Sequence, residues 1–268
     1  MRLPVGKILW GMFAFPLMYP AAFFAAAGLP LLGLIAVTLA WASGAMSFED
    51  QVSRWGLAIV NYMLFAWLAV RTHRLLLIGP DANLTQGSRV FPLSLRYLAA
   101  LATGAALKFL FLLAVMAAFS LLSLLVSFFI PGTPYDPAAA PASPPQADPD
   151  IQRLINYGVY VVELPVIYLL ARWSTLLPAI ALGYDWAPKA ARRQTLGNGW
   201  RLVIVVFLLP WALDAAVDWA YAATESPWIV GILAVIRAVF LALGVIALSL
   251  SYRELPPWPE PPPTTPPA

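Results

Sequence analysis

Long apolar runs separated by short polar connections make up almost the whole chain. A run of about 20 apolar residues crosses about 30 Å of hydrocarbon when it forms a helix that rises about 1.5 Å per residue. Such runs occur at residues 29–47, 55–70, 97–130, 151–170, 202–222 and 228–250. The pattern therefore predicts an all-α fold, a polytopic transmembrane helical bundle whose six spans form a single domain over residues 1–254.

A further apolar run at residues 8–27 is interrupted by Pro16 and Pro20. Proline removes a backbone donor, and its ring collides with the preceding helical turn. We expect an interfacial or re-entrant helix here, which meets the first span at Gly28–Pro30. A seventh span with the N-terminus outside is the alternative.

Two proline-rich segments and one lysine mark places where spans end. Residues 131–150 are rich in proline and alanine and contain no basic residue, which is typical of a flexible outer loop. Residues 255–268 are mostly proline and predict a disordered or polyproline II tail. Lys108 interrupts the run 97–130, so we expect residues 97–107 to lie at the surface and the span to begin after them.

The composition is typical of a membrane protein, since 61% of the residues are hydrophobic and 11% are charged, whereas soluble domains carry about 25% charged residues. The net charge of +3 does not indicate nucleic-acid binding, because the basic residues are spread among the spans.

Cytoplasmic loops are enriched in Lys and Arg. Six spans with both termini inside place twelve basic residues on the cytoplasmic side and two, Arg54 and Arg153, outside. This distribution predicts a multi-pass protein of the bacterial inner (plasma) membrane with both termini cytoplasmic.

Charged residues inside the predicted spans are the main candidates for a functional site, because each costs about 2.5–3.5 kcal/mol on insertion scales. Asp214 and Arg237 fall at similar depth on two spans joined by a short turn around Ser226, so we expect antiparallel helices and an ion pair. Asp218 lies one turn outward on the same face. Glu163 lies about 6 Å deeper, within reach of a long arginine. An ion pair that fixes helix register and a proton or solute relay are both compatible with this cluster.

A metal or nucleophilic site is not indicated. The chain has no cysteine and its single histidine is His73, whereas metal sites take three or four convergent ligands. No P-loop, G-x-G-x-x-G or G-x-S-x-G motif is present, so we expect no catalytic residue and no cofactor.

Basic residues that flank the spans are candidate contacts to anionic lipid headgroups. These candidates are Arg71, His73, Arg74, Arg192, Arg193 and Arg201.

A recurring pattern surrounds the second inner loop. One span ends at Arg172, the stretch Ser174-Thr-Leu-Leu-Pro178-Ala-Ile-Ala follows, and an amphipathic segment ends at Gly197-Asn198 before Trp200-Arg201. An earlier span ends in Val70-Arg71-Thr72-His73-Arg74, with Arg71-Thr72 where a Trp-His-Arg-like signature would have its Trp. Over residues 55–125 and 155–250 the pattern resembles uncharacterised bacterial polytopic inner-membrane proteins, which are distantly like the membrane domain fused to some glycerophosphodiester phosphodiesterases. The resemblance implies a membrane topology and no catalytic residue.

These features favour a non-enzymatic scaffold or accessory subunit of the inner membrane. A transporter or permease that uses Glu163, Asp214 and Arg237 is the first alternative, and a membrane-embedded lipid enzyme is the second. The expected partners are the lipid bilayer and either another membrane protein or an anionic lipid, and not nucleic acid.

Overall fold

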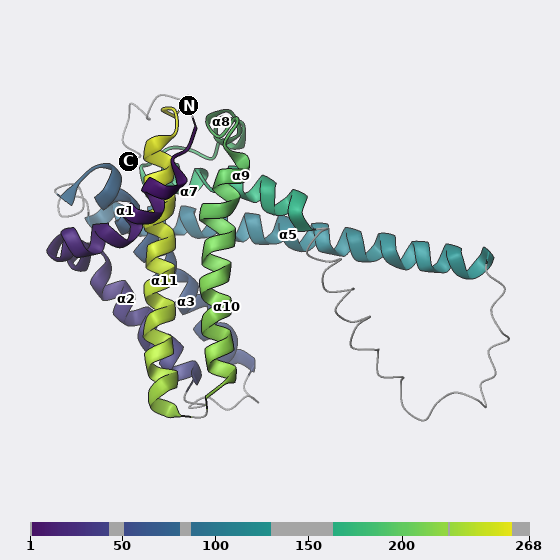
Figure 1. Ribbon diagram of the computed structural model, residues 1–268, viewed down its shortest axis with the longest axis horizontal. Coiled ribbons are helices and arrows are strands. Elements are labelled where there is room, and N and C mark those ends of the chain that lie inside the picture. Colours follow the sequence, from purple (N-terminus) through teal and green to yellow (C-terminus); the bar gives the residue numbers. More distant parts are fainter. Residues whose placement is uncertain (1, 43–50, 81–86, 130–162, 225, 259–268) are drawn as a thin grey trace. The chain divides into compact units, whose positions relative to one another are not determined.

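The computed structural model describes residues 2–42, 51–80, 87–129, 163–224 and 226–258. The predicted outer loop 131–150 and most of the predicted span 151–170 lie outside these residues. The chain divides into two compact units, one formed by Met1–Ala102 with Tyr168–Ala268 and the other by Thr103–Ile167. Every regular element in the described part of the chain is a helix (Figure 1). The elements are α1 (Val5–Met18), α2 (Pro20–Ala42), α3 (Gln51–Leu77), α5 (Gly87–Phe129), a helix at residues 163–173, α7 (Leu176–Ala181), α8 (Pro188–Gln194), α9 (Gly199–Leu202), the π-helix η2 (Val203–Leu208), α10 (Leu209–Ala222) and α11 (Pro227–Glu254).

Within the described residues, six helical segments are long and apolar enough to cross a membrane, which confirms the predicted fold class and makes the chain a multi-pass membrane protein. Their bounds differ from the predicted ones, because α2 continues through Pro30 and α3 continues past Arg71. The span predicted at 29–47 begins at Pro20, and the one predicted at 55–70 continues to Leu77. The six candidate spans are Pro20–Ala40, Trp55–Leu77, Arg89–Leu121, Glu163–Ala181, Gly199–Ala222 and Trp228–Glu254.

The N-terminal apolar run breaks at Tyr19, between α1 and α2. Pro20 disfavours the helical conformation at the residue before it, and Tyr19 is non-helical, with φ −129° and ψ 54°. With 14 residues, α1 is about 21 Å long and thus shorter than the hydrocarbon layer. The prediction that residues 8–27 do not form one straight span is confirmed. The predicted junction at Gly28–Pro30 is wrong, because α2 runs through it with Pro30 in its interior.

The helix α5 runs without a break from Gly87 to Phe129 and passes through Lys108. The expectation that Lys108 separates a surface segment 97–107 from a span is therefore wrong. Residues 97–107 are mostly Ala and Leu, which are strong helix formers, and lysine itself is a good helix former. A single charge interrupts the apolar run without ending the helix.

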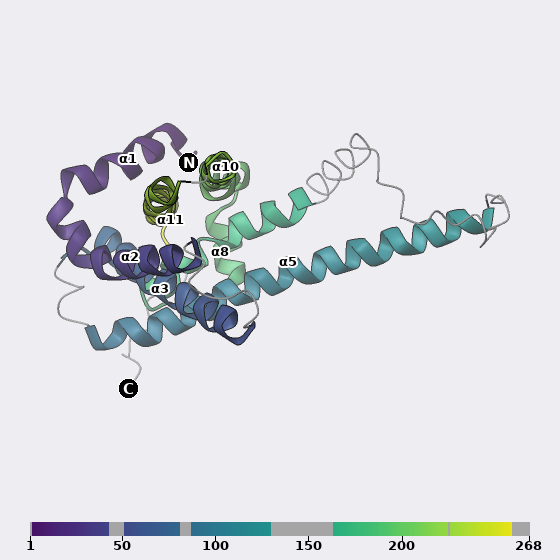
Figure 2. The ribbon, with the colours of Figure 1, turned by 90° about the horizontal axis from the view of Figure 1, so that it is seen from below.

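In the larger unit, α10 and α11 lie side by side, and α2 and α3 pack against α11 (Figure 1 and Figure 2). The hydrophobic core lies where α3, the start of α5, α7, α8 and α11 meet. Alanine is its most frequent residue, which lets helix backbones approach closely, the usual basis of helix association in lipid. The buried alanines of this core are Ala66, Ala69, Ala100, Ala179, Ala181, Ala190 and Ala191.

Polar contacts hold the N-terminal segment against other parts of the larger unit. The Leu3 N–H donates to Asn198 Oδ1 at 2.8 Å, and the Leu3 carbonyl accepts from Arg201 at 3.2 Å. Lys7 pairs with Glu254 at 2.8 Å. These contacts join α1 and the residues before it to α9, to the loop before α9 and to the end of α11.

The first residues of the proline-rich tail are also packed. Trp258 is 8% exposed, and its ring lies against those of Tyr184 and Tyr252. Residues 255–258 are therefore packed and not disordered, because a large aromatic side chain gains more by burial than an extended tail gains in freedom. Leu255, with φ −83° and ψ 162°, has the extended backbone that the polyproline II alternative requires. Residues 259–268 lie outside the described part of the chain.

Candidate functional site

A short turn sets the relation between α10 and α11. α10 ends at Ala222 and α11 begins at Pro227, a residue suited to the first helical position because it has no N–H to leave unpaired. A connection of four residues makes the two helices antiparallel neighbours. Asp214 lies eight residues before the end of α10, and Arg237 lies ten residues after the start of α11. Both charges therefore stand about 12–15 Å from the turn, near the middle of a bilayer.

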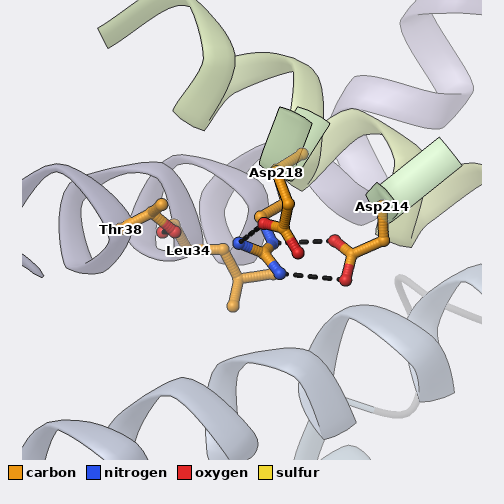
Figure 3. Close-up of polar contacts among 5 residues, drawn as sticks. Leu34, Thr38, Asp214 and Asp218 are labelled. Atoms are coloured by element: carbon orange, nitrogen blue, oxygen red, sulfur yellow. Dashed lines mark hydrogen bonds and ion pairs between the residues drawn. The ribbon is translucent and has the colours of Figure 1, made fainter. Parts of the chain in front are cut away.

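Arg237 holds two carboxylates at once (Figure 3). Its Nε is 2.9 Å from Asp214 Oδ1, and its Nη2 donates to Asp214 Oδ2 at 2.9 Å. Its Nη1 donates to Asp218 Oδ1 at 3.2 Å. Two parallel bonds from one guanidinium to one carboxylate are the strongest arrangement for such a pair. The structure thus brings together Asp214, Asp218 and Arg237, which are called the charge cluster below.

The charge cluster lies at the surface of its unit and not in the core. The side chains of Arg237, Asp214 and Asp218 are 36%, 46% and 59% exposed. With all three ionised, the cluster carries one net negative charge. On α2, which packs against α11, Thr38 donates its hydroxyl to the Leu34 carbonyl and so satisfies that donor within its own helix (Figure 3). Both α10 and α11 belong to candidate spans, where an uncovered charge costs about 2.5–3.5 kcal/mol.

A π-helix directly precedes this cluster. It covers Val203–Leu208, and α10 follows with Pro210 in its first turn. Proline cannot donate to the carbonyl four residues earlier, and its ring collides with that carbonyl. The wider π turn relieves this collision. The apolar pattern gave no sign of it, since periodicity does not report a local change in helix type, and π segments occur frequently at functional sites.

Glu163 has a different partner from the one expected. It lies in the smaller unit, where its Oε2 is 3.2 Å from Lys108 Nζ. This ion pair joins α5 to the start of the helix at residues 163–173, and the expected contact of Glu163 with Arg237, which belongs to the larger unit, stays a prediction. The sequence argument compared depths along the helices, and depth does not tell which way a side chain points.

An unpredicted polar network lies near the C-terminal end of α11. The imidazole of His73 has its Nδ1 2.7 Å from Ser249 Oγ and its Nε2 3.2 Å from the Tyr97 hydroxyl. Ser249 Oγ donates its single proton to the Val245 carbonyl at 2.9 Å. The consistent assignment has His73 Nδ1–H donating to Ser249 and the Tyr97 hydroxyl donating to Nε2. All four groups are then satisfied by contacts among α3, α5 and α11.

A serine hydroxyl beside a histidine can be an activated nucleophile, but this one is inaccessible. Ser249 and His73 are 0% exposed and Tyr97 is 1% exposed. The network therefore favours a structural role, as a lock between three helices. Tyr97 and Ser249 share no motif with His73, so nothing in the sequence identified them.

Two of the predicted headgroup contacts are buried instead. His73 is 0% exposed, and Arg74 is 4% exposed and donates to the Ala181 carbonyl at 3.2 Å. The expectation that these two side chains contact lipid headgroups is wrong, because α3 continues to Leu77 and α7 packs against it.

The other four predicted headgroup contacts differ among themselves. Arg71 donates to the Ala25 carbonyl at 2.8 Å, and Arg201 donates to the Leu3 carbonyl. Arg71 therefore links α3 to α2, and Arg201 links α9 to the segment before α1. Arg192 and Arg193 are exposed on α8.

Neither a metal site nor a similarity to known proteins indicates which activity the chain has. Within the described residues, no group of three or more His, Asp or Glu could hold a metal ion. No family model, no curated protein and no solved structure matches the chain. The resemblance to bacterial inner-membrane proteins therefore stays a prediction.

Proposed function

We propose that the protein is a non-enzymatic scaffold or accessory subunit of the bacterial inner membrane, with both termini in the cytoplasm. In this proposal it binds a transmembrane helix of another membrane protein through the charge cluster on α10 and α11. The observation that carries the proposal is that two carboxylates share one guanidinium on an exposed side of two candidate spans.

The chemistry of the cluster favours a partner helix that carries one basic residue. Asp218 makes a single 3.2 Å contact with Arg237 and is the most exposed of the three side chains. Three residues further along α10, the Tyr221 hydroxyl is buried and has no hydrogen-bond partner among the described residues. A basic side chain from a partner helix would neutralise the net negative charge of the cluster, and no water would be needed to solvate it. A second copy of this chain would bring a second net negative charge to the same depth, and repulsion disfavours it.

The two helices that carry the charge cluster also expose apolar side chains. Trp219 on α10 and Ile232 on α11 are 77% and 60% exposed. Lipid-facing helices expose such residues in any case, so the charge distinguishes this face and the apolar area does not. Tryptophan is nevertheless frequent in the energetic centre of interfaces.

The experiment uses a guest transmembrane peptide in phosphatidylcholine vesicles. The peptide is a leucine-rich helix of bilayer length with one central arginine, and a matched peptide has leucine there. The chain has no cysteine of its own, so Ala223→Cys at the turn takes a donor dye, and the peptide carries the acceptor. Interhelical polar contacts contribute about 1–2 kcal/mol in model membrane peptides, which is about 5- to 30-fold in association. We expect this preference for the arginine peptide.

Two substitutions locate the preference. Asp218→Asn keeps the side-chain shape and removes the net charge, so it should abolish the preference for the arginine peptide. Asp185→Asn removes a carboxylate that is exposed outside the candidate spans and should leave the preference intact. Equal binding of the two peptides, or an unchanged preference in Asp218→Asn, would show that the cluster does not recruit a basic helix.

Transport is a second candidate, supported by the π-helix beside Asp214. A relay would exchange a proton or solute at Asp214 and would need water to reach it. Protein in vesicles that enclose a pH-sensitive dye would then dissipate a proton gradient, and Asp214→Asn would stop the leak. A dye signal equal to that of empty vesicles would exclude proton movement through the cluster.

A further inference from the structure

The loop that connects the candidate spans Glu163–Ala181 and Gly199–Ala222 carries a basic surface that the proposed function does not use. The short helix α8 buries one side and exposes the other. Ala190, Ala191 and Gln194 are buried against the core. The exposed side, called the α8 basic face below, consists of Lys189, Arg192 and Arg193.

No carboxylate neutralises this face within the described part of the chain. Other basic residues have such partners, for example Lys7 with Glu254 and Arg96 with Asp185. The side chains of the α8 basic face form no ion pair with any described residue. Three positive charges on about one and a half helical turns thus have no carboxylate partner among the described residues and can bind an anion.

The position of the face points to the bilayer surface. The span Gly199–Ala222 begins five residues after α8 ends, so α8 lies close to the level of the headgroups. The apolar side chains on either side are exposed, with Trp186 at 44%, Leu196 at 75% and Trp200 at 58%. Tryptophan at both sides of a polar connection is typical of a membrane–water interface.

The α8 basic face is held in place before any ligand binds. Arg172 donates from Nε to Thr195 Oγ1 at 3.1 Å and from Nη2 to the Arg192 carbonyl. Gln194 Nε2 donates to the Pro256 carbonyl at 2.9 Å. These contacts fix the backbone of α8 from two other segments, so binding costs little further ordering of the backbone.

We infer that the α8 basic face binds the phosphate of an anionic phospholipid headgroup, while Leu196 and Trp200 lie against the acyl chains of the same leaflet. Arginine is suited to this role, because its planar guanidinium donates two parallel bonds to a phosphate. Three unpaired cations select a lipid with net negative charge over a zwitterionic one of equal size. Each charge near an anionic membrane surface raises affinity by up to about fivefold.

The experiment measures which lipid gathers beside the face. Leu196→Cys carries a donor dye in full-length protein in mixed vesicles of phosphatidylcholine and phosphatidylglycerol. Acyl-chain acceptors on one lipid or the other, at equal mole fraction, report local enrichment. We expect energy transfer to labelled phosphatidylglycerol to exceed transfer to labelled phosphatidylcholine severalfold. The variant with Lys189, Arg192 and Arg193 each changed to Gln should lower the first signal to the level of the second.

A matched variant distinguishes the effect of the α8 basic face from the effect of the overall charge of the protein. Changing Arg2, Arg89 and Arg253 to Gln removes the same charge from other exposed positions and should keep the phosphatidylglycerol excess. Transfer to phosphatidylcholine should stay constant in all variants, which checks that the protein remains folded and inserted. Equal transfer to both lipids in the unsubstituted protein, an unchanged excess in the α8 variant, or an equal loss in the matched variant would overturn the inference. These signals do not involve the charge cluster, so the result is independent of the proposed function.

Discussion

Replacing Arg237 by methionine should be one of the most damaging single changes in the chain. It leaves Asp214 and Asp218, four residues apart on one face of α10, without the cation that both contact. Removing one partner of a buried ion pair costs about 3–5 kcal/mol, mostly because the survivor stays unpaired. The charge cluster is partly exposed, but it lies on two candidate spans where lipid and not water would face it, so we expect the lower end of this range, about 3 kcal/mol.

The partner substitution Asp214→Asn should cost less, about 1.5–3 kcal/mol, since Arg237 keeps its contact with Asp218 and loses only the two charge-assisted bonds to Asp214. In the double variant the two losses overlap. The double loss should therefore fall short of the sum of the single losses by about 1.5 kcal/mol or more, within the range seen for contacting residues.

Unfolding in a series of detergent mixtures, followed by circular dichroism, gives the four free energies of this cycle. Arg96 and Asp185 provide a control, because they are the same residue types 3.7 Å apart with side chains 51% and 84% exposed. Exposed pairs contribute little, so their coupling should be about 0.5 kcal/mol or less. A coupling between Arg237 and Asp214 no larger than that of the control pair would refute the reasoning.

Three further outcomes follow from the structure. Gly199→Ala places a Cβ against the ring of Tyr168 and should destabilise the protein by about 1–3 kcal/mol in the same unfolding assay, with part of the loss recovered by Tyr168→Ala. Tyr97→Phe leaves Nε2 of His73 without its donor and should cost about 1–3 kcal/mol while guest-peptide binding is unchanged. Ala140→Cys, in the predicted outer loop, should react with a membrane-impermeant maleimide in intact cells, and resistance to the reagent would argue against cytoplasmic termini.

The parts of the fold that local sequence determines could be predicted. Asp214 and Arg237 lie on consecutive helices with a short turn between them, so counting residues from the turn gives their relative depth. The break near Pro20 could be expected for a similar reason, since proline restricts the residue directly before it. The expected position of the junction, at Gly28–Pro30, was nevertheless wrong, because α2 accommodates Pro30 within a helix that packs against its neighbours.

The features that depend on distant segments could not be predicted. His73 looked like an interfacial residue because Arg71 and Arg74 flank it, yet it is buried by contacts with Tyr97 and Ser249. Those two partners lie 24 and 176 residues away. The pairing of Glu163 with Lys108 is similar, since it depends on the direction in which two side chains point from separate helices.

Reversing the charge at Asp218 tests most directly whether the charge cluster recognises a partner helix by charge. The Asp218→Lys variant changes the net charge of the cluster from −1 to +1, and a guest peptide with one central aspartate supplies the complementary charge. Measured by energy transfer in phosphatidylcholine vesicles, the variant should bind the aspartate peptide in preference to the arginine peptide, while the unsubstituted protein shows the opposite order. The same order of preference in both proteins would contradict recognition by charge.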